Sequence, residues 1–212
     1  MTDKQPRFSG EFRDELVTLF KWRRSVRQFF TDPVPEELVE SLLALMQFAP
    51  SVGNSQPWRV VSDPRQRTNV FAAFDRADIK ARERYSGERL ATYDRLNLGG
   101  FKDAPVQLAI FTDMNPSAGH AQGRHTMPET LVHSTICAIH TLWLAARSHG
   151  LGLAWITSLE PSEIERIYAV PVAWRFTAYI CLGWPREEQS LPELETSDWQ
   201  KRSKVEDYLH SA

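Results

Sequence analysis

The sequence predicts a single α+β domain in which helices and strands follow one another in an irregular order. Its 212 residues are enough for one domain with a substantial core. Segments with helical apolar spacing are mixed with short apolar strands, without the regular alternation of a doubly wound parallel sheet. One segment, Ser134–Ala146, is apolar almost all round. Because such a helix is expected to be buried on every side, which one small subunit can hardly provide, we expect it to lie in a dimer core.

The first half of the chain contains mainly helices. Apolar residues at helical spacing, from Phe12 to Phe20, predict the first helix. Pro35 at the start of the second and Pro50 just beyond its end are positions where proline is tolerated. The expected elements are helices over 11–23, 35–49 and 65–85, a strand over 58–63, and the beginning of a helix over 87–96.

The second half combines most of the expected strands with the longest helix. The expected elements are strands over 106–113, 152–159 and 175–185, and helices over 129–150 and 161–168. A polar loop, Met114–His125, follows the first of these strands. The remaining residues, about 186–212, are polar and poor in pattern. We expect them to form a C-terminal arm of the single domain 1–212 that packs on the partner subunit.

Composition and charge exclude several classes of function. The formal net charge of −2 gives no global indication of a nucleic-acid partner. The sequence shows no signal core and no apolar run near the roughly 20 residues of a membrane span, so we expect a cytoplasmic protein. Cys137 and Cys181 lie in apolar stretches without a CxxC spacing, and we expect buried thiols and no metal site. His133 and His140 fall on the apolar helix and are expected to be core residues.

Three arginines lie within five positions in WRRSVRQF, residues 22–29. At a helix C-terminus a cation gains about 0.3–1 kcal/mol from the helix dipole, which accounts for one or two of them. This does not explain why Arg23 and Arg27 share a helix face, where like charges repel by roughly a few tenths of a kcal/mol. A phosphate would reverse that penalty, because guanidinium groups pair well with its oxygens. Residue chemistry leaves both the helix end and the phosphate site open.

The segment APSVGNSQPW, residues 49–58, lies between a helix and a strand. Ser, Gly and Asn are turn formers, so the simplest interpretation is a turn. The functional interpretation is a loop in which Asn54 and Gln56 donate and accept hydrogen bonds to a ring with carbonyl and N–H edges. The pattern does not decide between the two. The sequence has no dinucleotide fingerprint and no Walker-type loop, so a phosphate site in it has to be arginine-based.

These pieces, in this order, resemble the FMN-dependent nitroreductase superfamily. RRSVRQF resembles its phosphate-binding segment, APSVGNSQPW its flavin-edge loop, GLGLAWITS the strand beside the flavin ring, and WQKR its last phosphate contact. Within the superfamily the chain is most similar to the BluB branch, the 5,6-dimethylbenzimidazole synthases. The segments typical of that branch are PSVG at 50–53, YSGER at 85–89 and GRH at 123–125. The similarity runs from about Leu16 to Arg202.

The resemblance implies a nitroreductase-like fold, with a central mixed or antiparallel sheet flanked by helices, in an intertwined homodimer. It also implies two FMN sites at the interface, each built from both subunits. The residues that carry over are Arg23, Arg24, Ser25, Arg27 and Arg202 for the phosphate and ribityl chain, Pro50, Ser51, Asn54 and Gln56 for the flavin, from the other subunit, and Trp155, Ile156 and Thr157 along one edge of the ring.

For this branch the resemblance implies a reaction in which FMN is itself the substrate. Reduced FMN reacts with molecular oxygen and its ring is fragmented, which gives 5,6-dimethylbenzimidazole for cobalamin biosynthesis and erythrose 4-phosphate. Ser25 and Thr157 are the candidate catalytic residues. The branch carries Asp where this chain has Ser25, and Ser where it has Thr157. An Asp of raised pKa can exchange a proton near neutral pH, whereas an isolated Ser hydroxyl cannot.

Three functions therefore remain. The first is a synthase of this branch. The alternative is an NAD(P)H-dependent nitroreductase or quinone-type reductase that retains FMN as a cofactor, because RRSVR is the form that ordinary nitroreductases carry. The third is a non-catalytic flavin-binding protein, which is disfavoured because a site shared across a dimer and open to solvent favours turnover. In each case the polar loop 114–125 and the charged helices around Tyr85 would form a lid over a small-molecule substrate.

Overall fold

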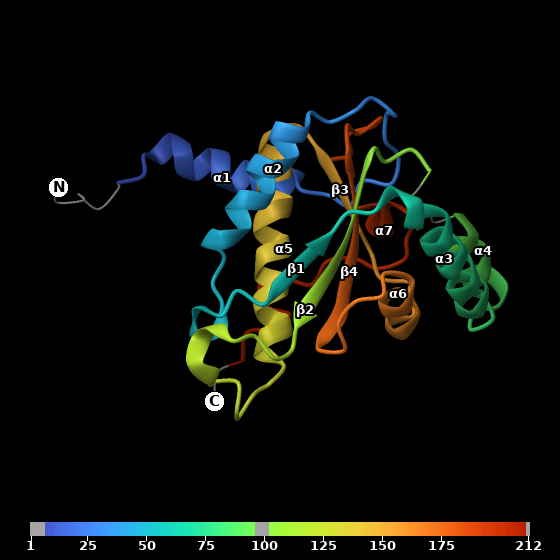
Figure 1. Ribbon diagram of the computed structural model, residues 1–212. Coiled ribbons are helices and arrows are strands. Elements are labelled where there is room, and N and C mark those ends of the chain that lie inside the picture. Colours follow the sequence, from blue (N-terminus) through green and yellow to red (C-terminus); the bar gives the residue numbers. More distant parts are fainter. Residues whose placement is uncertain (1–6, 96–101, 211–212) are drawn as a thin grey trace.

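The computed structural model describes residues 7–95 and 102–210. At its centre stands a four-stranded antiparallel sheet with the strand order β1-β2-β4-β3 (Figure 1). The strands are β1 (Trp58–Val61), β2 (Val106–Asp113), β3 (Gly152–Ile156) and β4 (Trp174–Gly183). Each forms where the sequence predicted a strand, although β3 ends before Thr157. The predicted α+β class with an antiparallel sheet is confirmed.

Each predicted helix also forms, with bounds that differ by a few residues. They are α1 (Gly10–Trp22), α2 (Glu36–Ala44), α3 (Arg67–Arg82), α4 (Gly87–Arg95), α5 (Thr130–Ser148) and α6 (Pro161–Ile167). A short helix that the sequence did not predict, α7 (Glu193–Thr196), forms in the arm. The second predicted helix is α2 continued by a tighter 3-10 turn, η1 (Leu45–Phe48). Leu96, the last residue of the predicted fourth helix, lies outside the described residues. None of the described helices is long and apolar enough to cross a membrane.

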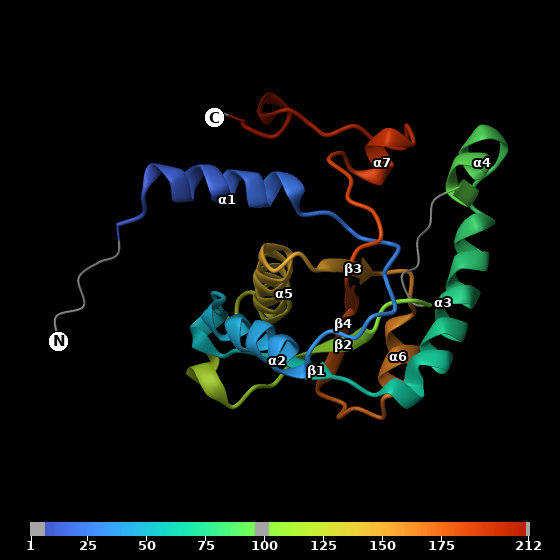
Figure 2. The ribbon, with the colours of Figure 1, turned by 90° about the horizontal axis from the view of Figure 1, so that it is seen from above.

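Both faces of the sheet are buried, which explains why its strands are apolar on consecutive residues. Along β2, Leu108 and Ile110 belong to one core cluster, whereas Ala109 and Phe111 belong to the other. Figures 1 and 2 show α2 and α5 over the first face and α3 and α6 over the second. The sheet thus holds the C-terminal half of α5 close to β3, where the candidate site lies.

Helix α5 is buried on one side only within the single chain. Its buried residues are Leu131, Ser134, Thr135, Ala138, Ile139, Leu142 and Ala146. On its other side Ile136 is 38% exposed, and His133 and His140 are exposed as well. The prediction that these histidines are core residues is therefore wrong for the chain by itself. Cys181 is buried as predicted, but Cys137 is only half-buried. The cover for the open side of α5, a second subunit, stays a prediction.

The arginine-rich stretch runs beside the edge strand β3. Ser25 forms a parallel bridge with Leu153, and the backbone N–H of Val26 donates to the carbonyl of Leu153 at 3.0 Å. A Cβ atom added at Gly152 would lie 2.6 Å from Cγ2 of Val26. Glycine at this position therefore permits the stretch to lie directly against the strand.

Candidate functional site

A cavity of about 190 Å³ lies between the arginine-rich stretch, the C-terminal half of α5 and the arm. We call it the arginine cavity. Its lining includes the five residues that the sequence assigned to a phosphate and ribityl chain, namely Arg23, Arg24, Ser25, Arg27 and Arg202. Its volume is below the roughly 300–1,000 Å³ of typical ligand pockets.

The arginines reach the cavity because the chain leaves the helical conformation after Trp22. Arg23 caps α1 in an extended conformation, with its N–H donating to the carbonyl of Leu19 at 2.9 Å. The idea that Arg23 and Arg27 share a helix face is therefore wrong, because pairing with β3 replaces the helix at this point. The cluster forms through the extended stretch and the returning arm instead.

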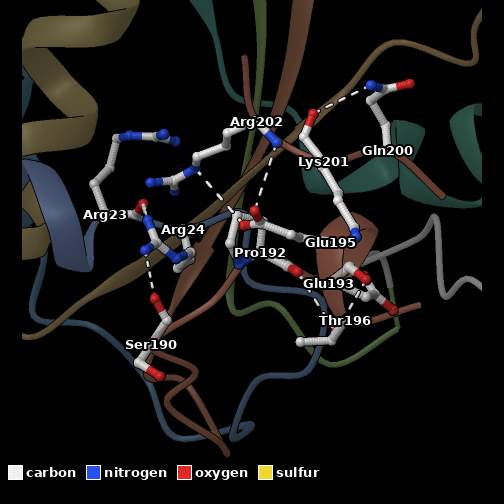
Figure 3. A network of polar contacts seen from close by, with 10 residues as sticks. All are labelled: Arg23, Arg24, Ser190, Pro192, Glu193, Glu195, Thr196, Gln200, Lys201 and Arg202. Carbon is white, nitrogen blue, oxygen red and sulfur yellow. Dashed lines mark hydrogen bonds and ion pairs between the residues drawn. The ribbon is translucent and has the colours of Figure 1, made fainter. Parts of the chain in front are cut away.

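Trp143 on α5 positions two of the arginines, and sequence reasoning missed it. The guanidinium of Arg23 lies 4.5 Å from the centroid of the Trp143 ring, a cation–π distance. The indole Nε1 of Trp143 donates to the carbonyl of Arg24 at 3.3 Å. Arg24 in turn donates from Nη2 to the carbonyl of Ser190 at 2.6 Å (Figure 3). The only signal for Trp143 in the sequence was its place on the apolar helix, which also predicts a core residue.

Two carboxylates of α7 pair with arginines of the cluster, and these too were missed. Oε2 of Glu193 lies 3.3 Å from Nε of Arg27, whose side chain is only 19% exposed. Oε2 of Glu195 lies 3.9 Å from Nε of Arg202 (Figure 3). The arm thus contributes Arg202 and Glu193 to the lining of the arginine cavity, with Glu195 paired to Arg202 beside it.

The electrostatics of the cavity favour an anion. Burial lowers the pKa of Arg23 and Arg24, and the nearby positive charge of Arg202 lowers it further. Burial also lowers the pKa of Arg27, against which Glu193 acts as a counter-charge. Nε of Arg24 is buried without a hydrogen-bond partner in the described part of the chain. Because guanidinium groups stay protonated, this excess of positive charge and donors suits a phosphate.

The segment from Pro50 to Gln56, which we call the amide loop, lies elsewhere in the chain. Its Val52 N–H donates to Oγ of Ser134 at 3.0 Å, near the start of α5, whereas Trp143 at the arginine cavity is nine residues further along the same helix. At 1.5 Å per residue, the two anchor points are about 14 Å apart along the axis. The single chain therefore does not bring Pro50, Ser51, Asn54 and Gln56 to the arginines.

The amide loop presents its side chains from a strained backbone. Asn54 and Gln56 have φ angles of 53° and 44°, in the left-handed region that L-residues rarely adopt. Gly53 packs so closely on Gly119 that a Cβ atom on it would lie 2.8 Å from the carbonyl oxygen of Gly119. Oγ of Ser51 accepts a hydrogen bond from the N–H of Gln56 at 3.2 Å. Both amides are exposed. Strain of this kind is concentrated at functional sites in proteins.

The predicted ring-edge residues differ in what they offer a ligand. Trp155 is half-buried, and its indole Nε1 is buried with no hydrogen-bond partner in the described part of the chain. Ile156 is 1% exposed within the core, so only its backbone can meet a ligand. Thr157 is exposed just beyond β3. It lies four residues after Leu153, the bridge partner of Ser25, which is about 13 Å along a strand. Ser25 and Thr157 therefore do not meet within one chain.

The branch-typical segment YSGER contacts the arm. The ring of Tyr85 stacks on that of Tyr93 at 4.8 Å and meets Trp199 edge-on at 5.4 Å. The guanidinium of Arg89 lies 4.3 Å from the centroid of Trp199. Trp199 precedes Arg202 by three residues, so the α3–α4 hairpin helps to hold the end of the arm at the arginine cavity. Within residues 7–95 and 102–210, no group of three His, Cys, Asp or Glu residues could bind a metal ion.

The chain is similar to proteins of one family. The model of the nitroreductase family matches residues 20–184. The chain is 50% identical over 199 residues to 5,6-dimethylbenzimidazole synthase of Rhodospirillum rubrum, which covers 93% of this chain and 94% of that protein. It is 44% identical over 201 residues to the 5,6-dimethylbenzimidazole synthase of Rhodobacter capsulatus, with 94% and 97% covered. Its fold resembles a crystal structure of oxidised iodotyrosine deiodinase bound to FMN and 3-iodo-L-tyrosine, with a TM-score of 0.71 and 24% identity over 90% of this chain and 96% of that chain.

Proposed function

This chain belongs to the nitroreductase family, and on that premise we propose that it is a flavin-dependent enzyme that makes 5,6-dimethylbenzimidazole from reduced FMN and molecular oxygen. The observation that carries the proposal is its 50% identity, over 93% of its length, to the synthase of Rhodospirillum rubrum. The family match over residues 20–184 includes the parts of the arginine cavity that lie outside the arm. The product would supply cobalamin biosynthesis with its lower ligand.

The arginine cavity is the proposed site for the phosphate of FMN. Arg27 is well shielded in this cavity, with a side chain only 19% exposed. Arg23, Arg24 and Arg202 add donors around it, and Ser25 lies beside the ribityl chain. A charge-assisted hydrogen bond from guanidinium to phosphate is about twice as strong as a neutral one. Among the described residues, the lining of the cavity includes no glycine-rich loop as a second phosphate-binding element, which favours FMN over FAD.

The flavin ring is proposed to lie between two subunits of a homodimer. The exposed amides of Asn54 and Gln56 would reach the ring edge from the partner, together with Pro50 and Ser51. Trp155, the backbone of Ile156 and Thr157 would border it from the first subunit. Two observations support this division. The amide loop lies about 14 Å from the arginine anchor along α5, and the open side of α5 exposes Ile136.

The chemistry would be supplied by the reduced flavin and oxygen, and the chain's own residues would bind the flavin and orient the reacting groups. Ser25 and Thr157 are hydroxyl donors at the two ends of β3, able to orient oxygen or a flavin edge by hydrogen bonds. Neither is a base at neutral pH. General acid–base assistance is worth about 10²–10⁴-fold per positioned group. We therefore expect that proton transfer limits the rate, because the wild-type chain has Ser25 in place of a carboxylate.

The deciding experiment supplies purified wild type and Ser25→Asp with reduced FMN and oxygen, and reads the product by mass spectrometry. We expect 5,6-dimethylbenzimidazole from wild type and more of it from Ser25→Asp. Riboflavin, which lacks the phosphate, serves as the control substrate. Neither variant is expected to release product from it at a comparable rate.

The alternative is an NAD(P)H-dependent nitroreductase or quinone-type reductase with retained FMN. The observation in its favour is Ser25 itself, within the RRSVR sequence typical of such reductases. If neither variant forms product, and NAD(P)H rapidly reduces a nitroaromatic or a quinone through the bound flavin, the synthase proposal is wrong. Equal product from wild type and Ser25→Asp would show that proton transfer at residue 25 does not limit the reaction.

A further inference from the structure

The arginine cavity contains its own negative charge, although it is built to take an anion. Glu193 lies at the first position of α7, and its carboxylate is 3.3 Å from Nε of Arg27. Both side chains are largely shielded from solvent, with 19% of Arg27 and 30% of Glu193 exposed. This ion pair is therefore less weakened by water and salt than an exposed pair would be.

Short-range contacts of the arm hold Glu193 in this position. The N–H groups of Glu195 and Thr196 donate to the carbonyl of Pro192 at 2.9 and 3.1 Å. The N–H of Trp199 donates to the carbonyl of Leu194 at 2.9 Å. Trp199 in turn packs on Tyr85, as described above. The carboxylate is thus delivered to Arg27 by a folded turn, and its position does not depend on Glu193 alone.

Without a ligand, the cavity needs this carboxylate. Arg27 would otherwise be a shielded guanidinium in a cavity that other arginines also line, and an uncompensated charge of that kind is strongly destabilising. With a phosphate bound, the same carboxylate becomes unfavourable. It would lie beside a group of nearly two negative charges, and it stands 3.3 Å from Nε, one of the donors through which Arg27 could bind the phosphate.

We propose that Glu193 competes with the ligand's phosphate for Arg27, and so keeps the affinity of the cavity for phosphate-bearing ligands moderate. The inference rests on the proposed function and deepens it. If FMN is consumed at each turnover, its phosphate enters and a phosphate-bearing fragment leaves every time. A carboxylate that takes back Arg27 lowers the barrier to that departure. A cofactor that stays bound would gain nothing from such a competitor.

The test titrates FMN and riboflavin into wild type and Glu193→Gln, as full-length protein. Gln keeps the shape of the side chain and removes its charge. We expect Glu193→Gln to bind FMN about five- to tenfold more tightly and to release it more slowly, the size of effect of one partly shielded charge pair. Riboflavin should bind to both proteins equally. In an Arg27→Gln background, Glu193→Gln should no longer change FMN affinity, because the carboxylate acts through Arg27.

Glu163→Gln is the matched control. Glu163 also pairs with an arginine, Arg76, at 2.6 Å and has a side chain 22% exposed, but it lies on α6, outside the lining of the cavity. It should leave FMN affinity unchanged. If Glu193→Gln does not fold, Glu193→Asp, which withdraws the carboxylate by one methylene, should tighten FMN binding in the same direction.

Two results would overturn the inference, and they differ in what else they affect. Unchanged or weaker FMN binding by Glu193→Gln, with normal binding by wild type, would show that Glu193 only orients Arg27, and the proposed function would stand. Failure of wild type to bind FMN at all would remove the inference and the proposed function together.

Discussion

The arginine cavity and the amide loop differ in how far their polar side chains are paired within the single chain. In the cavity, Arg27 and Arg202 are paired with acids of the arm, and Arg23 rests on Trp143. In the amide loop, Asn54 and Gln56 are exposed, at φ angles of 53° and 44°. The arginine cavity balances charges within its own chain, although Nε of Arg24 and Nε of Arg27 have no hydrogen-bond partner in the described residues. The amide loop instead holds two exposed amides, which hydrogen-bond to each other at 3.4 Å, on a strained backbone.

This difference indicates which region recognises which part of the ligand. A region whose charges are balanced by its own chain can recognise phosphate locally, through charge. A region with exposed amides on a rigid backbone is organised for a surface that the chain does not itself provide. We infer that phosphate recognition belongs to one subunit and that ring recognition depends on two. The predictions below separate these contributions.

We expect the largest effect from a substitution that prevents a partner subunit from packing on the open side of α5. Ile136→Glu places a carboxylate at a residue that is 38% exposed in the single chain. If this side is the dimer interface, burying the charge costs several kcal/mol and the dimer dissociates. FMN affinity should then fall about a hundredfold or more, equivalent to roughly 3 kcal/mol, because each cavity loses the partner's amide loop. Size-exclusion chromatography with light scattering and a flavin titration measure both outcomes.

Val172→Glu is the control for this substitution. Val172 is fully exposed in the turn between α6 and β4, and the change should affect neither the oligomeric state nor flavin binding. A wild type that is monomeric yet binds FMN fully would contradict the shared site.

The next largest effect is expected from a substitution that affects recognition of the phosphate alone. Arg27→Ala should weaken FMN binding about ten- to a hundredfold, since one charge-assisted hydrogen bond contributes roughly 1.5–3 kcal/mol. Riboflavin binding should hardly change. Fluorescence titration of both ligands gives the comparison, with Arg76→Ala as an arginine control outside the cavity lining. Equal losses for the two ligands would mean that Arg27 is a structural residue.

The smallest effect is expected from a substitution that affects recognition of the flavin ring. Asn54→Gly removes the amide but keeps a residue that accepts positive φ without strain. FMN and riboflavin should both lose about three- to tenfold in affinity, because a neutral hydrogen bond contributes roughly 0.5–1.5 kcal/mol. Ala169→Gly, at another positive φ of 47°, controls for the change in backbone freedom. A loss confined to FMN would place Asn54 at the phosphate instead.

The fold could be predicted from the sequence where the pattern of apolar residues was local and periodic. The strands showed as apolar runs because both sheet faces are covered, and α5 showed as a long apolar helix. The exceptions arose where distant contacts decide. Helical spacing continued into Arg23 and Arg27, yet pairing with β3 imposes an extended backbone there. The strand pattern continued to Leu159, yet a turn closes at Thr157, whose carbonyl accepts from Leu159 N–H at 2.9 Å.

The candidate site could be predicted from the sequence only in part, because some of its residues are brought together by distant contacts. The resemblance assigns Arg23, Arg24, Arg27 and Arg202 to a phosphate site, and the structure brings them together around one cavity. Trp143, Glu193 and Glu195 were missed. An aromatic residue on an apolar helix and acids in a polar arm have no sequence pattern that distinguishes a site from ordinary core and surface. Their roles depend on how the arm returns to α5, which is a long-range contact.

The return of the arm also determines when a growing polypeptide can acquire this site. The cavity is lined by Trp22 and Arg23 near the beginning of the chain and by Arg202 near its end. At about 5–20 residues per second, translation of the intervening segment takes roughly 10–40 seconds. During that interval the nascent chain has no complete arginine cavity. A ligand of this cavity can therefore stabilise the fold only once Arg202 has been added, and cannot assist the folding of a nascent chain that ends before it.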